Sequence, residues 1–202
     1  MTNYNRVAWI YELLGRIVFG NKLKLANQAY LDKISIDSKV LVVGGGNGNI
    51  IEYLNDLGYS IAVDYVEPSP RMMYLARKQK NYRLSVRYFN SPIEDFKGSD
   101  YNFIITNFFF DQFNPLRSKV ILGSLRTMLT RDGLLILNDF NYSENRGDRL
   151  LIYIMIKFFR FSTGIEANEL PLYSKILNDC GFINNDSFQI SRNIRASLYS
   201  TN

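Results

Sequence analysis

Short apolar runs alternate along this chain with longer stretches in which apolar residues recur every three or four positions. The runs have the length of buried strands and lie at 40–43, 61–66, 84–89, 101–106 and 134–137, with a turn expected at 131–133. The amphipathic stretches between them predict helices, among them 70–80 and 114–128. Strands that are apolar throughout are typical of a parallel sheet covered on both faces. The pattern therefore predicts an α/β fold.

Both ends of the chain add elements to this alternation. Residues 5–19 predict an amphipathic helix, which Gly20-Asn21 breaks. A second helix is predicted before the first strand, with Leu23, Ala26, Tyr30 and Ile34 on one face. Near the other end, a helix at 169–180 is followed by two strands, at 182–187 and 193–200. The two leading helices are additional to a minimal nucleotide-binding fold, which begins with a strand.

The first strand runs directly into Gly44-Gly45-Gly46-Asn47-Gly48. Glycines at a strand end let the backbone turn sharply and approach a ligand closely, and the helix that follows offers free N–H groups to a polar or anionic group. The G-x-G-x-G spacing differs from the G-x-G-x-x-G dinucleotide pattern, because position 49 is Asn. The loop is interpreted as a ligand site, with a plain strand-to-helix turn as the alternative.

The second strand ends at Glu67-Pro68-Ser69, about 20 residues beyond the glycine loop. At that distance an acid at the end of the second strand meets the two hydroxyls of a ribose. An ionised carboxylate accepts both in charge-assisted hydrogen bonds. Glu67 also suits the start of the helix expected from Pro70, where negative charge is favourable. The two roles are compatible, and we expect ribose binding.

Four segments in order, GGGNG, VEPSPRMM, NSPIEDF and YNFIITNFFF, resemble those of class I S-adenosylmethionine-dependent methyltransferases. The chain looks most like the small members related to ubiquinone and menaquinone methyltransferases. The resemblance implies a Rossmann-like three-layer sandwich with a seven-stranded, mostly parallel sheet in the order 3-2-1-4-5-7-6, its last strand antiparallel. It also implies one domain over residues 1–202, with an N-terminal helical cap at 1–36 and a helical insertion near the substrate pocket at 144–168.

The same resemblance implies S-adenosyl-L-methionine as the cofactor. The residues that would bind it are Gly44, Gly45, Gly46, Gly48, Glu67, Pro68, Met72, Ser91, Pro92, Ile93 and Asn107. Three positions depart from the family pattern. Ser91 stands where an aspartate usually holds the adenine edge, Pro92 has no N–H to donate, and Val42 replaces an acid that many relatives carry. We therefore expect the adenine contact to use the Ser91 hydroxyl or the N–H of Ile93.

The composition of the chain limits which ligands and partners are expected. The chain has 202 residues, a formal net charge of +5, one cysteine and no histidine. One cysteine excludes an internal disulfide and a CxxC pair, and histidine is the commonest metal ligand, so no metal is expected. The basic residues are scattered, which argues against a nucleic-acid partner. The first residues lack a secretion-signal profile and no apolar run is long enough to span a membrane, so a cytoplasmic location is expected.

The fourth strand leads into Asn107-Phe108-Phe109-Phe110-Asp111-Gln112-Phe113. Relatives that methylate adenine or glutamine carry Asn or Asp followed by Pro-Pro-Tyr here, and that signature is absent. Three successive phenylalanines predict an apolar wall for a small or medium-sized, partly apolar acceptor. Since alternate residues face opposite ways, at least one of them is expected to pack in the core instead. Asp111 and Gln112 are the polar groups best placed to meet the acceptor.

Without histidine, a general base would have to be an acid or a tyrosine. The candidates are Asp111, Asp139, Glu166 and Tyr11, the last of which belongs either to the substrate pocket or to the core. An acceptor that is already nucleophilic needs no base, so the sequence leaves the catalytic residues unassigned.

Residues 149–161 are apolar almost all round but too short to span a bilayer. Three interpretations stay open: a buried helix, a hydrophobic lid over the substrate, and a shallow peripheral contact of basic and apolar side chains with a membrane surface.

Other functions also stay open. The triple glycine resembles the G-G-G-D-G loop of polyamine synthases, which transfer an aminopropyl group from decarboxylated cofactor, but those enzymes have several acids after the fourth strand. A nicotinamide-dependent reductase is disfavoured by Asn49. A non-catalytic module that binds S-adenosylmethionine would be consistent with the altered adenine loop.

Overall fold

The computed structural model describes residues 20–141 and 173–201, together with positions 145, 147, 150, 153, 154 and 157. The described strands are β1 (Lys39–Val43), β2 (Ile61–Val66), β3 (Leu84–Phe89), β4 (Tyr101–Asn107), β5 (Leu129–Phe140), β6 (Phe182–Ser191) and β7 (Ile194–Thr201). The described helices are α2 (Asn21–Gln28), α3 (Asn49–Asn55), α4 (Pro70–Ala76), α5 (Pro115–Met128) and α7 (Tyr173–Asp179). Three short 3₁₀ turns are η1 (Leu31–Lys33), η2 (Ile93–Asp95) and η3 (Phe110–Gln112).

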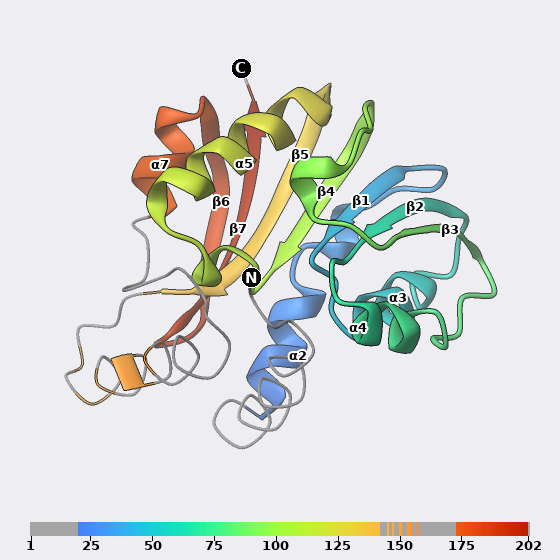
Figure 1. The fold of residues 1–202 in the computed structure, drawn as a ribbon, viewed down its shortest axis with the longest axis horizontal. Coiled ribbons are helices and arrows are strands. Elements are labelled where there is room, and N and C mark those ends of the chain that lie inside the picture. The colour runs from blue at the N-terminus through green and yellow to red at the C-terminus, as the bar shows by residue number, and fades with distance from the viewer. Residues whose placement is uncertain are drawn as a thin grey trace.

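The strands form one seven-stranded sheet in the order β3-β2-β1-β4-β5-β7-β6 (Figure 1). All neighbouring pairs among the first five strands are parallel, and β7 pairs antiparallel with both β5 and β6. The predicted Rossmann-like fold and its strand order are confirmed. Helix α2 confirms a helix ahead of the first strand, but it ends at Gln28. The predicted face residues Tyr30 and Ile34 lie beyond it, because Tyr30 has a left-handed φ of 62°. The helix predicted at 5–19 lies outside the described residues.

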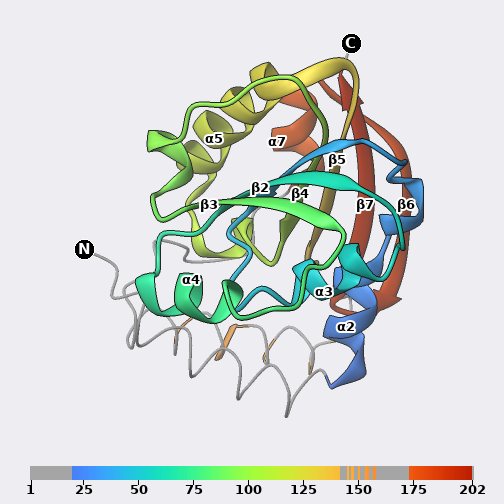
Figure 2. The same cartoon turned by 90° about the vertical axis from the view of Figure 1, so that its right-hand side faces the viewer.

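Helices cover both faces of the sheet (Figure 2). On one face, α2, α3 and α4 lie over side chains such as Val40, Val42 and Ile105. On the other, α5 and α7 cover the alternate positions, such as Leu41, Val43 and Ile104. Because successive side chains of a strand point to opposite faces, each central strand contributes to both cores and must be apolar throughout.

The turn predicted at 131–133 is wrong. β5 begins at Leu129, directly after α5, and its pairing with β4 shifts register between Tyr101 and Phe103. A Cβ on Gly133 would lie 2.7 Å from the Tyr101 carbonyl oxygen. The glycine therefore permits a close approach of two strands at a bulge, a use that looks like a turn signal in the sequence.

Candidate cofactor site

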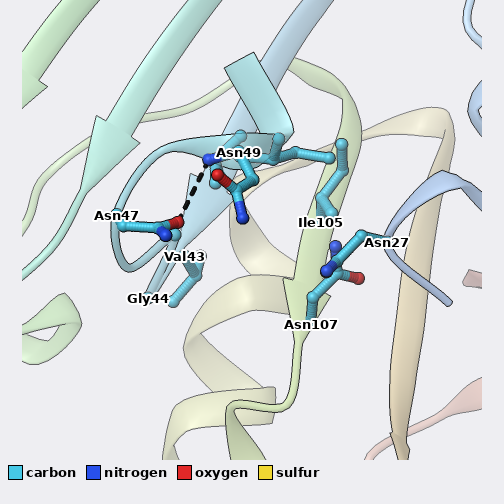
Figure 3. Close-up of a pocket in the computed structure, with 10 residues that line it drawn as sticks. Asn27, Val43, Gly44, Asn47, Asn49, Ile105 and Asn107 are labelled. Atoms are coloured by element: carbon cyan, nitrogen blue, oxygen red, sulfur yellow. Dashed lines mark hydrogen bonds between the residues drawn. The ribbon is translucent and has the colours of Figure 1, made fainter. Parts of the chain in front are cut away.

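A pocket lies where β1 and β4 end, between α2 and α3. Its open volume is about 360 Å³, and its lining consists of Asn27, Val42, Val43, Gly44, Gly45, Asn47, Asn49, Ile50, Ile105 and Asn107. Figure 3 shows Asn47 and Asn49 on the glycine-loop side and Asn27 and Asn107 facing them across the pocket. No charged side chain is among these residues, so polar recognition here depends on amides and on backbone groups.

The glycines of the loop serve different purposes. A Cβ on Gly44 would lie 2.5 Å from the Phe109 ring, and one on Gly48 would lie 2.6 Å from the Cα of Ala76 in α4. These two glycines are required by the packing of the protein itself. Gly46 differs, because a Cβ there would meet no atom within 4 Å. The open side of Gly46, at φ +63°, is where a bound molecule could approach the backbone closely.

Glu67 lies directly beside this open loop. Its Oε2 accepts a hydrogen bond from the Gly46 N–H at 3.0 Å, and its Oε1 accepts one from the Ser69 N–H at 2.9 Å. The side chain is 6% exposed. Burial raises the pKa of Glu67, and the two backbone bonds oppose that rise. Each carboxylate oxygen retains a second lone pair, so the group fits two further hydroxyl donors.

The residues expected to contact the adenine lie on two separate segments, α4 and the loop that follows β3. Met72 is half-buried in α4, and Pro92 is exposed. The side chain of Ile93 is 4% exposed and packs in the core beneath α5, so only its backbone is available to a ligand. Asn90 ties this loop to the second strand, because its side-chain amide donates to the Glu67 carbonyl at 2.8 Å. Pro68 and Ser91 are half-buried next to Glu67 and Asn90 in sequence.

The predicted residue Asn107 lines the pocket, but sequence reasoning missed the amides of Asn27 and Asn138 beside it. Asn138 is fully buried at the end of β5, and its Nδ2 donates to the Ala26 carbonyl of α2 and to Asn107 Oδ1, each at 2.8 Å. Asn27, next to Ala26 on α2, consequently lines the pocket. A polar residue at the end of a predicted strand was a usable signal for Asn138. Nothing in the local sequence distinguishes Asn27 from any other asparagine on a helix.

Asp139, a candidate base from the sequence, is buried and hydrogen-bonds to the backbone of the protein itself. Its side chain is 2% exposed, its Oδ2 accepts from the Phe110 N–H at 3.0 Å, and its Oδ1 accepts from the Phe140 N–H at 2.7 Å. Burial, followed by the neighbouring Asp111 carboxylate, raises the pKa of Asp139 well above its ordinary value. The bonds attach η3 to β5. Asp111 lies in η3 and is half-buried, while Tyr11 and Glu166 lie outside the described residues.

The three successive phenylalanines have unequal positions. Phe109 and Phe110 are 5% and 0% exposed and pack in the core with Phe113 and α5. Phe108 is half-buried, and its ring contacts Phe140 with centroids 5.0 Å apart. Its φ of +50° lies in the left-handed region, which is unusual for a bulky residue and is found at functional sites. Of the expected apolar wall, Phe108 is therefore the member left available to a ligand.

Within the part of the chain that the structure describes, no cluster of His, Cys, Asp and Glu side chains is suited to hold a metal ion. Over the same residues, no helix has the length and apolar character needed to cross a membrane.

Comparisons with known proteins agree with this geometry. Residues 41–137 match the family model described as "Methyltransferase domain". A protein of Staphylococcus carnosus (strain TM300), described as an uncharacterized methyltransferase, is 26% identical over 174 residues, which cover 82% of this chain and 79% of that protein.

Solved structures show the same fold at low identity. The mitomycin 7-O-methyltransferase has a TM-score of 0.72 and 15% identity over 95% of this chain, which spans 57% of that enzyme's length. The 1,6-didemethyltoxoflavin-N1-methyltransferase of Burkholderia thailandensis, solved with 1,6-didemethyltoxoflavin and S-adenosylhomocysteine bound, has a TM-score of 0.67 and 16% identity over 98% of this chain and 88% of its own.

Proposed function

We propose that the chain is a class I methyltransferase that uses S-adenosylmethionine, and that it methylates a small or medium-sized, partly apolar acceptor. The observation that carries the proposal is the position of Phe108. It is half-buried, in a left-handed conformation, and directly follows Asn107 of the pocket. Pockets with mostly apolar walls and few polar groups suit small organic ligands.

The cofactor site is proposed from the described contacts. Glu67 would accept the ribose hydroxyls through its remaining lone pairs, and the open side of Gly46 would lie against the cofactor. The amides of Asn27, Asn107 and Asn49 would contact its polar amino-acid end. The backbone of the loop at 91–93 would border the adenine. When bound, the cofactor supplies an activated methyl group on a sulfonium, which a nucleophile displaces in line.

The protein's own part in the reaction is mainly to hold two molecules in line. Positioning of this kind can contribute about 7–11 kcal/mol to lowering a barrier. The rings of Phe108 and Phe140 would exclude water on the acceptor side. A protein base is needed only if the acceptor must lose a proton, and Asp111 is the candidate we choose for that role, ahead of Asp139, whose oxygens already bond to two backbone N–H groups.

Named relatives support an organic acceptor. The Burkholderia enzyme was solved with 1,6-didemethyltoxoflavin bound, and the mitomycin enzyme is named as a 7-O-methyltransferase. We take from them the class of acceptor, a small organic molecule, and neither its identity nor the atom methylated. Cytoplasmic location remains part of the proposal.

The segment at 149–161 is proposed to border the acceptor or a membrane surface. Leu150, Tyr153 and Ile154 are 58%, 54% and 54% exposed, which argues against the buried-helix interpretation at these positions. An apolar acceptor would be consistent with both remaining interpretations.

Aminopropyl transfer remains the competing proposal because of the triple glycine. The region after β4 has one acid, Asp111, rather than the several that would bind a polyamine. Titration calorimetry with S-adenosylmethionine, its decarboxylated form and NAD separates the classes. We expect binding of S-adenosylmethionine alone. Preferential binding of the decarboxylated form would overturn methyl transfer. If none of the three compounds binds, the protein has the fold of a methyltransferase without its cofactor binding.

A mixed library of phenols, aromatic amines, quinols and polar amines, incubated with methyl-labelled cofactor, tests the acceptor class. We expect label in partly apolar compounds. Label only in polar amines or oligonucleotides would contradict the proposed class of acceptor.

A further inference from the structure

Tyr65 near the end of β2 and Glu67 directly after the strand hydrogen-bond to the same residue of the glycine loop, Gly46. The Gly46 N–H donates to Glu67 Oε2 at 3.0 Å, and the Tyr65 hydroxyl donates to the Gly46 carbonyl at 2.8 Å. Tyr65 and Glu67 are two positions apart, so both side chains point to the same face of the strand. The Gly46 peptide groups therefore have little freedom to rotate while β2 is in place.

The Tyr65 ring also determines which residue can precede Gly46. Tyr65 is completely buried, and its ring contacts Tyr88 with centroids 5.6 Å apart. A Cβ on Gly45 would overlap ring carbons of Tyr65 and would lie 2.5 Å from its hydroxyl oxygen. The ring is fixed between the loop and Tyr88 and cannot move aside without disturbing the core. The middle glycine of the triplet is thus required by Tyr65, in contrast to Gly46, whose open side faces the ligand.

The geometry points to Tyr65 as a positioning residue of the cofactor site, which sets the orientation of the Gly46 backbone and makes glycine obligatory at position 45. This inference rests on the proposed cofactor site around Gly46 and Glu67. By occupying the Gly46 carbonyl, the hydroxyl turns that oxygen toward β2 and leaves the Cα side of Gly46 to the ligand. Burial and the Glu67 charge raise the pKa of Tyr65 well above its ordinary value, and the backbone N–H of Gly48 opposes this rise. The hydroxyl therefore stays a donor at neutral pH.

The direct test is Tyr65→Phe, which keeps the ring and removes the hydroxyl. We expect binding of S-adenosylmethionine to weaken roughly fivefold to tenfold, the equivalent of one neutral hydrogen bond. Tyr88→Phe is the matched control, because its hydroxyl bonds only weakly, at 3.4 Å, to the Ala76 carbonyl of α4. Calorimetry gives the affinities. The amide signal of Gly46 in ¹⁵N-labelled, ligand-free protein should shift and exchange faster in Tyr65→Phe, and should stay unchanged in Tyr88→Phe.

Gly45→Ala tests the steric half of the inference. As a single substitution, Gly45→Ala should abolish measurable binding of S-adenosylmethionine, because the alanine methyl group and the Tyr65 ring cannot both fit. Combined with Tyr65→Leu, which removes the ring, it should bind better than Gly45→Ala alone, so that the two changes are non-additive. Full affinity in Gly45→Ala, or no improvement in the double variant, would overturn the steric requirement.

Unchanged affinity and an unchanged Gly46 amide in Tyr65→Phe would overturn the positioning role. If wild-type protein does not bind S-adenosylmethionine, the proposed function fails instead. The Gly46 amide comparison needs no ligand, so it still decides whether Tyr65 orients the loop.

Discussion

The side-chain amide of Asn138 donates a hydrogen bond to the backbone carbonyl of Ala26, which lies 112 positions earlier in the chain, at 2.8 Å. Its second amide hydrogen bonds to Asn107 Oδ1. The end of β5 thereby holds α2 over the glycine loop, and α2 brings Asn27 to the pocket. Helix α2 is thus part of the site rather than an addition to it.

Replacing Asn138 with Ala should cost both stability and affinity. The Ala26 carbonyl and Asn107 Oδ1 would each lose one hydrogen bond, at about 0.5–1.5 kcal/mol for each bond. Because α2 would no longer be fixed, we also expect weaker binding of S-adenosylmethionine. Urea unfolding and titration calorimetry measure the two effects. Asn102→Ala is the control, since its side chain accepts an exposed hydrogen bond from the Lys39 N–H at the start of the strands. Wild-type affinity in Asn138→Ala would show that α2 is dispensable.

Glu67→Gln should weaken cofactor binding by about 1.5–3 kcal/mol, the range for a hydrogen bond to a charged group. The effect should depend on pH. Burial raises the pKa of Glu67 above its usual value, so the carboxylate takes up a proton at a higher pH than an exposed glutamate does. Wild-type affinity should therefore be constant at neutral pH and decrease as the pH falls through this raised pKa, whereas the Gln variant should show no such decrease.

Calorimetry between about pH 5 and 8 measures the Glu67 effect, with Glu94→Gln as the control because Glu94 pairs with Arg117 away from the pocket. Parallel pH profiles for wild type and Glu67→Gln would remove Glu67 from ribose binding.

Gly46→Val should abolish cofactor binding while the protein remains folded. A Cβ at Gly46 would meet no protein atom within 4 Å, so the valine side chain would extend into the volume assigned to the ligand. The left-handed φ adds a local cost of about 1–2 kcal/mol. Gly46→Ala also adopts a left-handed φ, at a lower cost than the β-branched valine, and with less bulk it should bind more tightly than the valine variant. Equal affinities for alanine and valine would mean that backbone strain, and not ligand contact, explains the glycine.

Phe108→Ala and Phe110→Ala should separate acceptor recognition from folding. Phe110 is fully buried in the core, and its truncation should destabilise the protein by about 3–5 kcal/mol. Phe108 is half-buried, so its truncation should cost less stability but change which labelled acceptors are methylated. Thermal unfolding and the acceptor screen measure the two properties. A loss of stability without any change in acceptor preference for Phe108→Ala would assign this residue to the core as well.

Most of the fold was predictable because it depends on patterns that are local in sequence. The strands at 61–66 and 84–89 have the predicted bounds, since runs of apolar residues between turn signals leave few alternatives. The turn predicted at 131–133 was wrong because, in the sequence, a glycine that permits close contact between two strands cannot be told from one that makes a turn. The predicted acid at the end of the second strand does meet the glycine loop, at Gly46.

The parts of the site that escaped prediction depend on contacts between distant segments. Asn27 lines the pocket through a bond made by Asn138, and neither residue carries a pattern that indicates the other. The Phe108–Phe110 run shows the same limit, because only the turn after β4 decides which ring packs in the core and which is left half-exposed.

The interior place of β7 in the sheet has a consequence for how the molecule opens. Among the strands that the structure describes, β6 pairs only with β7, whereas β7 pairs on its other side with β5. Amide hydrogens of β6 can therefore exchange through partial openings that leave the rest of the sheet intact, but β7 cannot detach without releasing β6 as well. Since α2 contacts β5, β6 and β7, a partial opening that reaches β7 would also loosen the helix that carries Asn27. Cofactor binding should accordingly slow hydrogen exchange in β7, at a distance from the glycine loop.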